Sequence, residues 1–103
     1  MGQLTVAERR AAVRAAAAAL VGFDGVVHQA GSAELGPLFA ELDQLKTLVG
    51  AAQVGVLDQA LSRGDVKASD AASPAGWVRQ WGTTYRAGGA AALVRVAVGG
   101  RQA

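Results

Sequence analysis

The chain has 103 residues, a net charge of +2 at pH 7 and a hydrophobic content of 51%. The absence of cysteine excludes disulfide bonds and thiolate metal sites, and it is typical of proteins of the reducing cytoplasm. The longest apolar run is far shorter than the roughly 20 residues that span a bilayer, so no membrane partner is expected. Because 24 residues are alanine, we expect helices that pack closely over small side chains.

The first predicted helix covers residues 5–21. Thr5 at its start can accept a hydrogen bond from the amide of Glu8, and the Glu8 carboxylate can accept one from the amide of Thr5, which makes a capping box. The alanine-rich sequence that follows strongly favours a helix. Gly22 and Gly25 then predict its end and a loop.

A long second helix is predicted over residues 37–62, where Pro37 suits the first turn because its missing amide donor would be unpaired there. Apolar residues recur along this helix at alternating spacings of three and four, which places them on one stripe that we expect to be buried. Two arrangements would bury it: an antiparallel helical bundle within the chain, or a coiled-coil seam between two copies. The stripe consists of Leu35, Leu38, Leu42, Leu45, Val49, Ala52 and Val56.

A polar turn over residues 62–72 is expected to lead into a short helix at residues 74–81. Ser73 is a suitable N-cap for this helix, and Pro74 is a suitable first helical residue. The two tryptophans of the chain, at positions 77 and 81, fall on the apolar face of the helix and are expected in the core. The alternative is that they stack on nucleic-acid bases. We expect one of them to rest on the glycine pair Gly88–Gly89 of the next helix.

The last predicted helix covers residues 85–98, with Thr83 or Thr84 as its cap and Gly99–Gly100 as its end. Two short helices joined by about three residues have the spacing of a helix-turn-helix, a spacing that most small helical hairpins share. The elements together predict an all-α fold, a small bundle of about four helices with a helix-turn-helix-like C-terminal hairpin. Residues 1–103 would form a single domain or a fragment of one.

No pattern of catalytic or metal-ligating residues is present in the sequence. His28 is the only histidine, so every two-histidine metal motif is excluded, and a capping or surface role is expected for it. The glycine pairs lack the lysine and serine or threonine that end a phosphate-binding loop. We therefore expect no cofactor, no metal ion and no small-molecule ligand, and no catalysis by this chain alone.

Charge is distributed unevenly along the chain. Residues 1–62 carry a net charge of −2, whereas residues 63–103 carry +4, an asymmetry that mildly favours a polyanionic partner such as DNA for the C-terminal part. The candidate contacts are Arg79, Arg86 and Arg95. Arg86 is the best of them, because recognition helices use their N-terminal turn on bases and phosphates. Arg86 and Arg95 are nine positions apart and point in opposite directions on a helix, so they cannot form one tight patch.

Three segments in this order resemble the 13E12-repeat proteins of actinobacteria, which are classed as a domain of unknown function. They are LDQLKTLVGAAQVGVLDQALSRGDV (42–66), ASPAGWVRQW (72–81) and YRAGGAAALVRVA (85–97), which lie within a span covering over half of the chain. The resemblance implies the N-terminal helical part of proteins that often carry an HNH nuclease domain further along. The chain has one histidine and no asparagine, so the nuclease site is missing, and we expect a truncated relative or a fragment.

Two functional hypotheses follow from the sequence. The first is a cytoplasmic, non-catalytic helical module that associates with DNA through its basic C-terminal hairpin. The alternative is an oligomerisation or protein-interaction domain that uses the apolar stripe of the long helix to pair with a second copy or with another protein.

Overall fold

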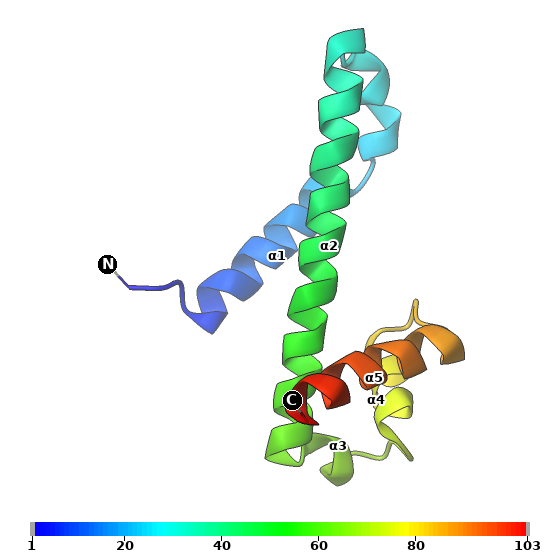
Figure 1. Cartoon of the computed structure of the whole chain (residues 1–103). Coiled ribbons are helices and arrows are strands. Elements are labelled where there is room, and N and C mark those ends of the chain that lie inside the picture. Colours follow the sequence, from blue (N-terminus) through cyan, green and yellow to red (C-terminus); the bar gives the residue numbers. More distant parts are fainter. Residues whose placement is uncertain (1, 103) are drawn as a thin grey trace. The chain divides into compact units, whose positions relative to one another are not determined.

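A computed structural model of the chain describes the backbone of residues 2–102 and the side chains of residues 2–99. Within this range every regular element is a helix, which confirms the predicted all-α fold (Figure 1). The chain divides into two compact units, Met1–Ala40 and Glu41–Ala103, and each is described by itself. The α-helices are α1 (Val6–Leu20), α2 (Ser32–Arg63), α3 (Asp65–Ala68), α4 (Pro74–Trp81) and α5 (Ala87–Gln102).

Helix α1 of the first unit begins where the sequence predicts, because both hydrogen bonds of the capping box are present. The amide of Glu8 donates to Oγ1 of Thr5 over 3.1 Å, and the amide of Thr5 donates to Oε1 of Glu8 over 3.3 Å. The helix ends at Leu20, and Gly22 follows in a left-handed conformation with φ of 74°. Only glycine adopts this conformation readily, so the chain turns away at the predicted position.

The described part of the first unit, residues 2–40, contains no buried residue. All of α1 is exposed, including Val13 at 68%. The predicted loop that follows contains two short 3₁₀ helices, η1 (Phe23–Gly25) and η2 (Val27–Gln29), which bury no residue either. Isolated helices of about 12–15 residues are marginal in water, so α1 depends on its cap and on alanine propensity.

Helix α2 begins at Ser32, five residues before Pro37, so the prediction that this proline opens the helix is wrong. The amide of Gly31 donates to Oε1 of Glu34 over 2.9 Å, and this bond organises a helical turn ahead of the proline. Pro37 therefore lies inside the helix, where it cannot donate a hydrogen bond to the carbonyl of Ala33. The loss is confined to the second turn, and the helix continues to Arg63.

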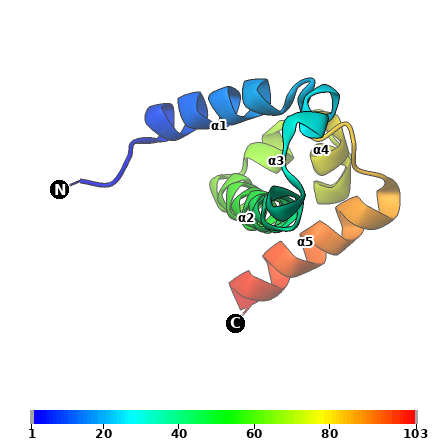
Figure 2. The same ribbon diagram turned by 90° about the horizontal axis from the view of Figure 1, so that it is seen from above.

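The core of the second unit forms where α4 and α5 pack against each other and against the C-terminal half of α2 (Figures 1 and 2). Leu57 of α2 is 1% exposed and clusters with Val78 of α4 and with Ala90 and Ala97 of α5. The two alanines have small side chains, which allow α5 to approach closely and to cross α2 steeply, rather than lie antiparallel to it. The partly buried residues around this cluster are Val54, Leu61, Ala75, Trp77, Tyr85, Leu93 and Val94.

The predicted apolar stripe of α2 is not the face that forms this core. In the second unit Val49 is 49% exposed and Val56 is 61% exposed, and Ala52 between them is also exposed. The expectation that the stripe is buried is therefore wrong for its C-terminal part. Of the other stripe residues, Leu35 is exposed, and Leu38, Leu42 and Leu45 are half-buried.

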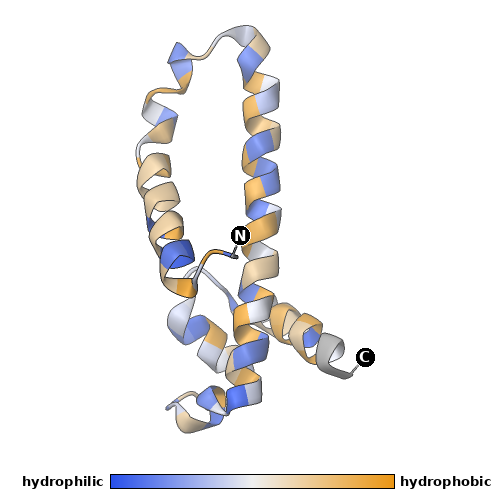
Figure 3. Ribbon diagram, turned by 90° about the vertical axis from the view of Figure 1, so that its left-hand side faces the viewer, coloured by the Kyte–Doolittle hydropathy of each residue, from blue (hydrophilic) through white to orange (hydrophobic). Residues whose placement is uncertain are grey.

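The contacts of α2 with the core come from a second set of apolar residues, Val54, Leu57 and Leu61. Leu57 follows Val56 directly, so its side chain is rotated from that of Val56 by about 100° around the helix. Both sets recur at spacings of three and four, which is why spacing alone selects neither. Figure 3 shows apolar residues recurring along the length of α2.

The predicted polar turn at residues 62–72 contains α3, a helix of a single turn. Gly64 precedes it with φ of 79°, again a conformation suited to glycine, and Val66 within it is buried. Oγ of Ser69 then donates to the carbonyl of Val66 over 2.6 Å and closes the turn. The connection is therefore more ordered than its polar composition indicates.

Helix α5 ends later than predicted, because it passes through Gly99–Gly100 and continues to Gln102. A glycine inside a helix costs only about 1 kcal/mol relative to alanine, which is too little to stop a helix held elsewhere. The preceding turns of α5 are held by Ala97, which is 2% exposed in the core. The prediction that the glycine pair ends the helix is wrong.

Candidate nucleic-acid interface

The candidate interface is the hairpin of α4 and α5, whose first helix is positioned as the sequence predicts. Oγ of Ser73 accepts a hydrogen bond from the amide of Gly76 over 3.0 Å, and Pro74 is the first helical residue. One turn later Val78 is 5% exposed and enters the core. The cap at Ser73 and the buried side chain of Val78 together fix the position of α4, and with it the start of the turn that follows.

The turn between α4 and α5 is tied to α2 by one hydrogen bond between side chains. The hydroxyl of Tyr85 donates to Oε1 of Gln53 over 2.6 Å. The amide of Tyr85 donates to the carbonyl of Gly82 over 3.0 Å, so the ring lies close to that glycine. A Cβ atom on Gly82 would lie 2.9 Å from Cδ2 of Tyr85 and 3.1 Å from the carbonyl oxygen of Val78. Glycine is required here by this close approach.

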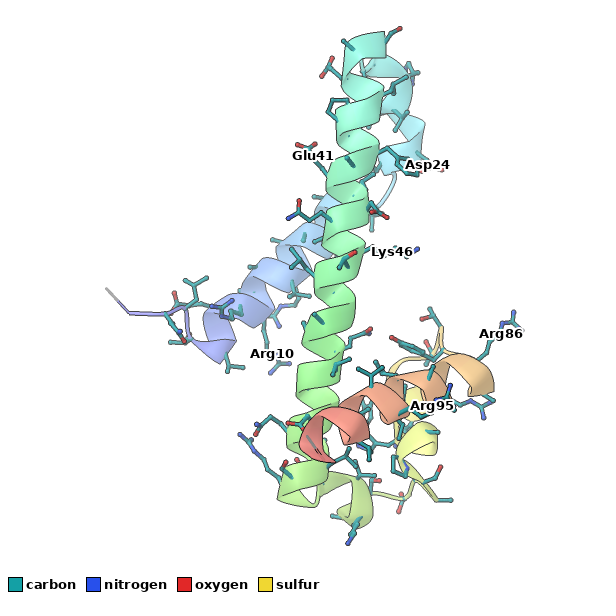
Figure 4. The ribbon with its side chains drawn as sticks, viewed as in Figure 1. Arg10, Asp24, Glu41, Lys46, Arg86 and Arg95 are labelled. Atoms are coloured by element: carbon teal, nitrogen blue, oxygen red, sulfur yellow. The ribbon has the colours of Figure 1, made fainter. Side chains whose placement is uncertain are left out.

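Helix α5 starts at Ala87, later than predicted, and this gives Arg86 a special position. The amide of Ala90 donates to the carbonyl of Arg86 over 2.9 Å, which makes Arg86 the N-cap residue. Neither Thr83 nor Thr84 is the N-cap, so that prediction is wrong, because the hydrogen bonds of Tyr85 delay the start of the helix. Arg86 is exposed and projects away from the helices (Figure 4).

The other two predicted contacts, Arg79 and Arg95, are exposed as well but lie apart from Arg86. Arg79 belongs to α4 and is separated from Arg86 by the whole turn. Arg95 lies nine residues after Arg86 along α5, a rise of about 13.5 Å at 1.5 Å per residue (Figure 4). The three arginines therefore offer spaced positive charges, and Arg86 is the one at the turn.

The two tryptophans differ sharply in exposure. Trp77 packs partly buried against the core, as predicted, whereas Trp81 is 71% exposed, so its predicted core position is wrong. Trp81 is the last residue of α4 and lies three positions after Val78, the buried residue of that helix. The turn between α4 and α5 therefore has an exposed aromatic ring at its start, on Trp81, and an exposed cation at its end, on Arg86. The position of Trp81 directly before Gly82 is the sequence signal that could have indicated this.

The glycine pair of α5 receives no tryptophan. A Cβ atom on Gly88 would meet no other described atom within 4 Å, and one on Gly89 would lie 3.5 Å from Cδ1 of Tyr85. The predicted contact with a tryptophan is therefore wrong, because Tyr85 of the turn lies there. Gly88 and its neighbour are exposed and leave the N-terminal turns of α5 without bulky side chains.

The electrostatic character of the hairpin is uniformly basic. Residues 71–103 contain four arginines and no aspartate or glutamate. In contrast, the four acidic residues nearest in sequence lie before the hairpin, at positions 43, 58, 65 and 70. An approaching polyanion would meet no carboxylate of α4, α5 or their turn.

No metal site is evident among residues 2–102, where no three histidine, aspartate or glutamate side chains come together. His28 is exposed in η2, in the first unit. Over the same residues no helix has the combination of length and apolarity that crossing a bilayer requires. The hairpin therefore stands as the candidate interface through its exposed arginines and its lack of carboxylates.

Comparisons with protein-family models, with curated proteins and with solved structures find no match to this chain. The resemblance to 13E12-repeat proteins rests on the quoted segments alone.

Proposed function

We propose that the chain is a non-catalytic helical module that associates with DNA through the hairpin of α4 and α5. The observation that carries this proposal is the 71% exposure of Trp81 at a turn that also presents Arg86. Exposed aromatic rings and exposed cations are a common means of binding nucleic acids, because the ring stacks on a base while the cation neutralises a phosphate.

The start of α5 adds to this proposal. Backbone amides of a helix's first turn are unpaired within the helix and carry a partial positive charge, so they attract phosphate oxygens. Arg86 is the N-cap, and the bare backbone at Gly88 leaves room for a strand to approach. Arg79 and Arg95 would then contribute longer-range attraction to phosphates on either side.

The resemblance to 13E12-repeat proteins agrees with this role, since relatives that carry an HNH nuclease domain act on DNA. We place no nuclease activity in this chain, because its single exposed histidine cannot supply the ligands of such a site. Association with DNA suits the reducing cytoplasm that the absence of cysteine indicates.

The proposal is tested by fluorescence anisotropy with labelled duplex and single-stranded DNA at low salt. We expect a dissociation constant of about 1–100 µM that weakens steeply as salt is raised, because bound cations release counterions from the phosphates. Replacing Arg79, Arg86 and Arg95 together by alanine should weaken binding about 10-fold or more and flatten the salt dependence. Trp81→Ala should weaken binding to single strands about 10-fold through lost stacking.

The matched control removes the same charge from the first unit, by replacing Arg9, Arg10 and Arg14 of α1 with alanine. These three arginines are also exposed, so non-specific attraction would respond equally to either triple variant. We expect the α1 variant to bind as the unmodified chain does. Equal weakening by both triple variants, or no binding at about 100 µM chain, would contradict the proposal.

A further inference from the structure

We propose that the part of α2 in the second unit pairs in parallel, and in register, with the same segment of a second copy of this chain. The pairing surface consists of the stripe residues of the second unit, which we name the 42–56 stripe: Leu42, Leu45, Val49, Ala52 and Val56. It lies on a face of α2 other than the one that Leu57 turns towards the core. It is independent of the proposed contact with DNA.

Exposure is the first argument for a partner on this face. Val49 and Val56 are 49% and 61% exposed, and Leu48, which flanks them, is 58% exposed. Helix α2 thus carries two apolar sets in the second unit, of which its own core uses only the one containing Leu57. Contiguous exposed apolar residues on a helix are the usual mark of a surface that another helix covers.

The spacing of the 42–56 stripe assigns its positions in a coiled coil without ambiguity. In a heptad repeat with positions a to g, a d residue lies three positions after an a residue, and the next a residue lies four positions after d. The a positions of the stripe are therefore Leu42, Val49 and Val56, and the d positions are Leu45 and Ala52. Two of the three a residues are β-branched valines and Leu45 is at d, a combination that favours two strands within a parallel coiled coil. The small Ala52 lets the two helices approach closely at the middle of the seam.

Charge complementarity then selects the second copy and its orientation. Glu41 precedes the a residue Leu42 and is a g position, and Lys46 follows the d residue Leu45 and is an e position. Both are exposed, and Figure 4 shows them on opposite sides of α2. Five residues apart, they point about 140° away from each other and cannot pair within one helix.

In a parallel dimer a g residue faces the e residue five positions further along the partner helix. Glu41 of each copy would therefore face Lys46 of the other, giving two symmetric pairs of opposite charge. In an antiparallel dimer g faces g and e faces e, so Glu41 would meet another Glu41, Leu48 or Gly55. Only the parallel arrangement brings opposite charges together.

The proposal is tested by sedimentation equilibrium of the full chain and of two charge variants, Glu41→Lys and Lys46→Glu. We expect the unmodified chain to form dimers below about 200 µM and each variant alone to dimerise about 10-fold more weakly, because like charges then face each other. An equimolar mixture of the two variants should recover the dimer, because the lysine introduced in one copy would face the glutamate introduced in the other.

Two further variants separate the seam from general effects of charge and folding. Lys67→Glu makes the same charge change at an exposed position of α3 and should leave dimerisation unchanged. Val49→Asp should abolish the dimer while the helical circular dichroism signal stays constant, because this side chain is half exposed and outside the core. A chain that stays monomeric at all concentrations would overturn the proposal, because no second copy would then cover the stripe. A dimer that the mixture fails to restore would overturn it as well.

Discussion

The two units of this chain are both helical, yet they are stabilised by different means. Residues 2–40 contain no buried side chain, and α1 is held by a capping box and by alanine propensity. The second unit instead packs Leu57 of α2 and Val78 of α4 against Ala90 and Ala97 of α5. Helix propensity and capping therefore suffice to define a helix locally, whereas a core needs large apolar side chains that several elements share.

The charges of the two units also differ in arrangement. Residues 1–40 have three arginines and three acidic residues, with Glu8 directly before Arg9 and Arg10. The hairpin of the second unit has arginines alone, on helices that the core holds in fixed positions. Substitutions in the first unit are therefore suitable controls for substitutions in the second, because the first unit has the same residue types without the same packing.

The largest expected difference between the units comes from truncating a leucine in each. Leu57→Ala removes the 1% exposed side chain at the centre of the core and should lower the free energy of unfolding by about 2–5 kcal/mol. Leu20→Ala in α1 removes a side chain that is 40% exposed and should lower it by less than about 1 kcal/mol. Urea denaturation followed by circular dichroism measures both, and equal losses would break the comparison.

A second pair of substitutions sharpens the account of the turn in the second unit. Gly82→Ala places a methyl group 2.9 Å from the ring of Tyr85 and should destabilise the chain by about 1–3 kcal/mol. Gly88→Ala adds the same methyl group inside α5, where it meets no described atom within 4 Å, and should stabilise it by about 0.5–1 kcal/mol. The change in thermal midpoint reports the sign of each, and two changes of the same sign would refute the assigned contact.

The smallest effect concerns the two helix caps, Thr5 of α1 and Ser73 of α4. Each side chain accepts one hydrogen bond from a backbone amide, at 3.1 Å and 3.0 Å respectively, so Thr5→Ala and Ser73→Ala should each cost about 1 kcal/mol. Because α1 has no buried residue, the loss at Thr5 should appear as partial loss of helix signal. The loss at Ser73 should shift the cooperative unfolding transition instead. Matching behaviour of the two variants would mean that the units do not differ in cooperativity.

Local signals in the sequence predict the local features of this fold well. Both caps and the glycine after α1 are where the sequence predicts them, because each depends on residues no more than a few positions apart. Two local predictions fail. At the start of α2, Glu34 and Pro37 offer competing local starts and the hydrogen bond from Gly31 decides between them. At the end of α5, Gly99–Gly100 does not stop the helix, which continues to Gln102. Periodicity and caps were therefore sufficient for the fold class.

Features that depend on tertiary contacts cannot be predicted from such local signals. Two apolar sets on α2 have the same spacing, and only the partners on α4 and α5 decide that Leu57 is buried and Val56 is not. The start of α5 depends on a bond between Tyr85 and Gln53, which are 32 positions apart. The exposure of Trp81 follows from where the core ends along α4. For the candidate interface, the sequence offers the three arginines as candidates, but it places Trp81 in the core, whereas its side chain is 71% exposed.

The most direct test of the functional account is a chemical-shift map of the ¹⁵N-labelled full chain titrated with a short duplex DNA at low salt. If the hairpin of the second unit binds DNA, the largest changes will occur at the indole NH of Trp81 and at the backbone amides from Arg86 to Gly89. The exposed α1 amides around Arg9 and Arg10 will change little. Changes concentrated on α1, or equal changes in both units, would contradict the assignment of DNA association to the hairpin.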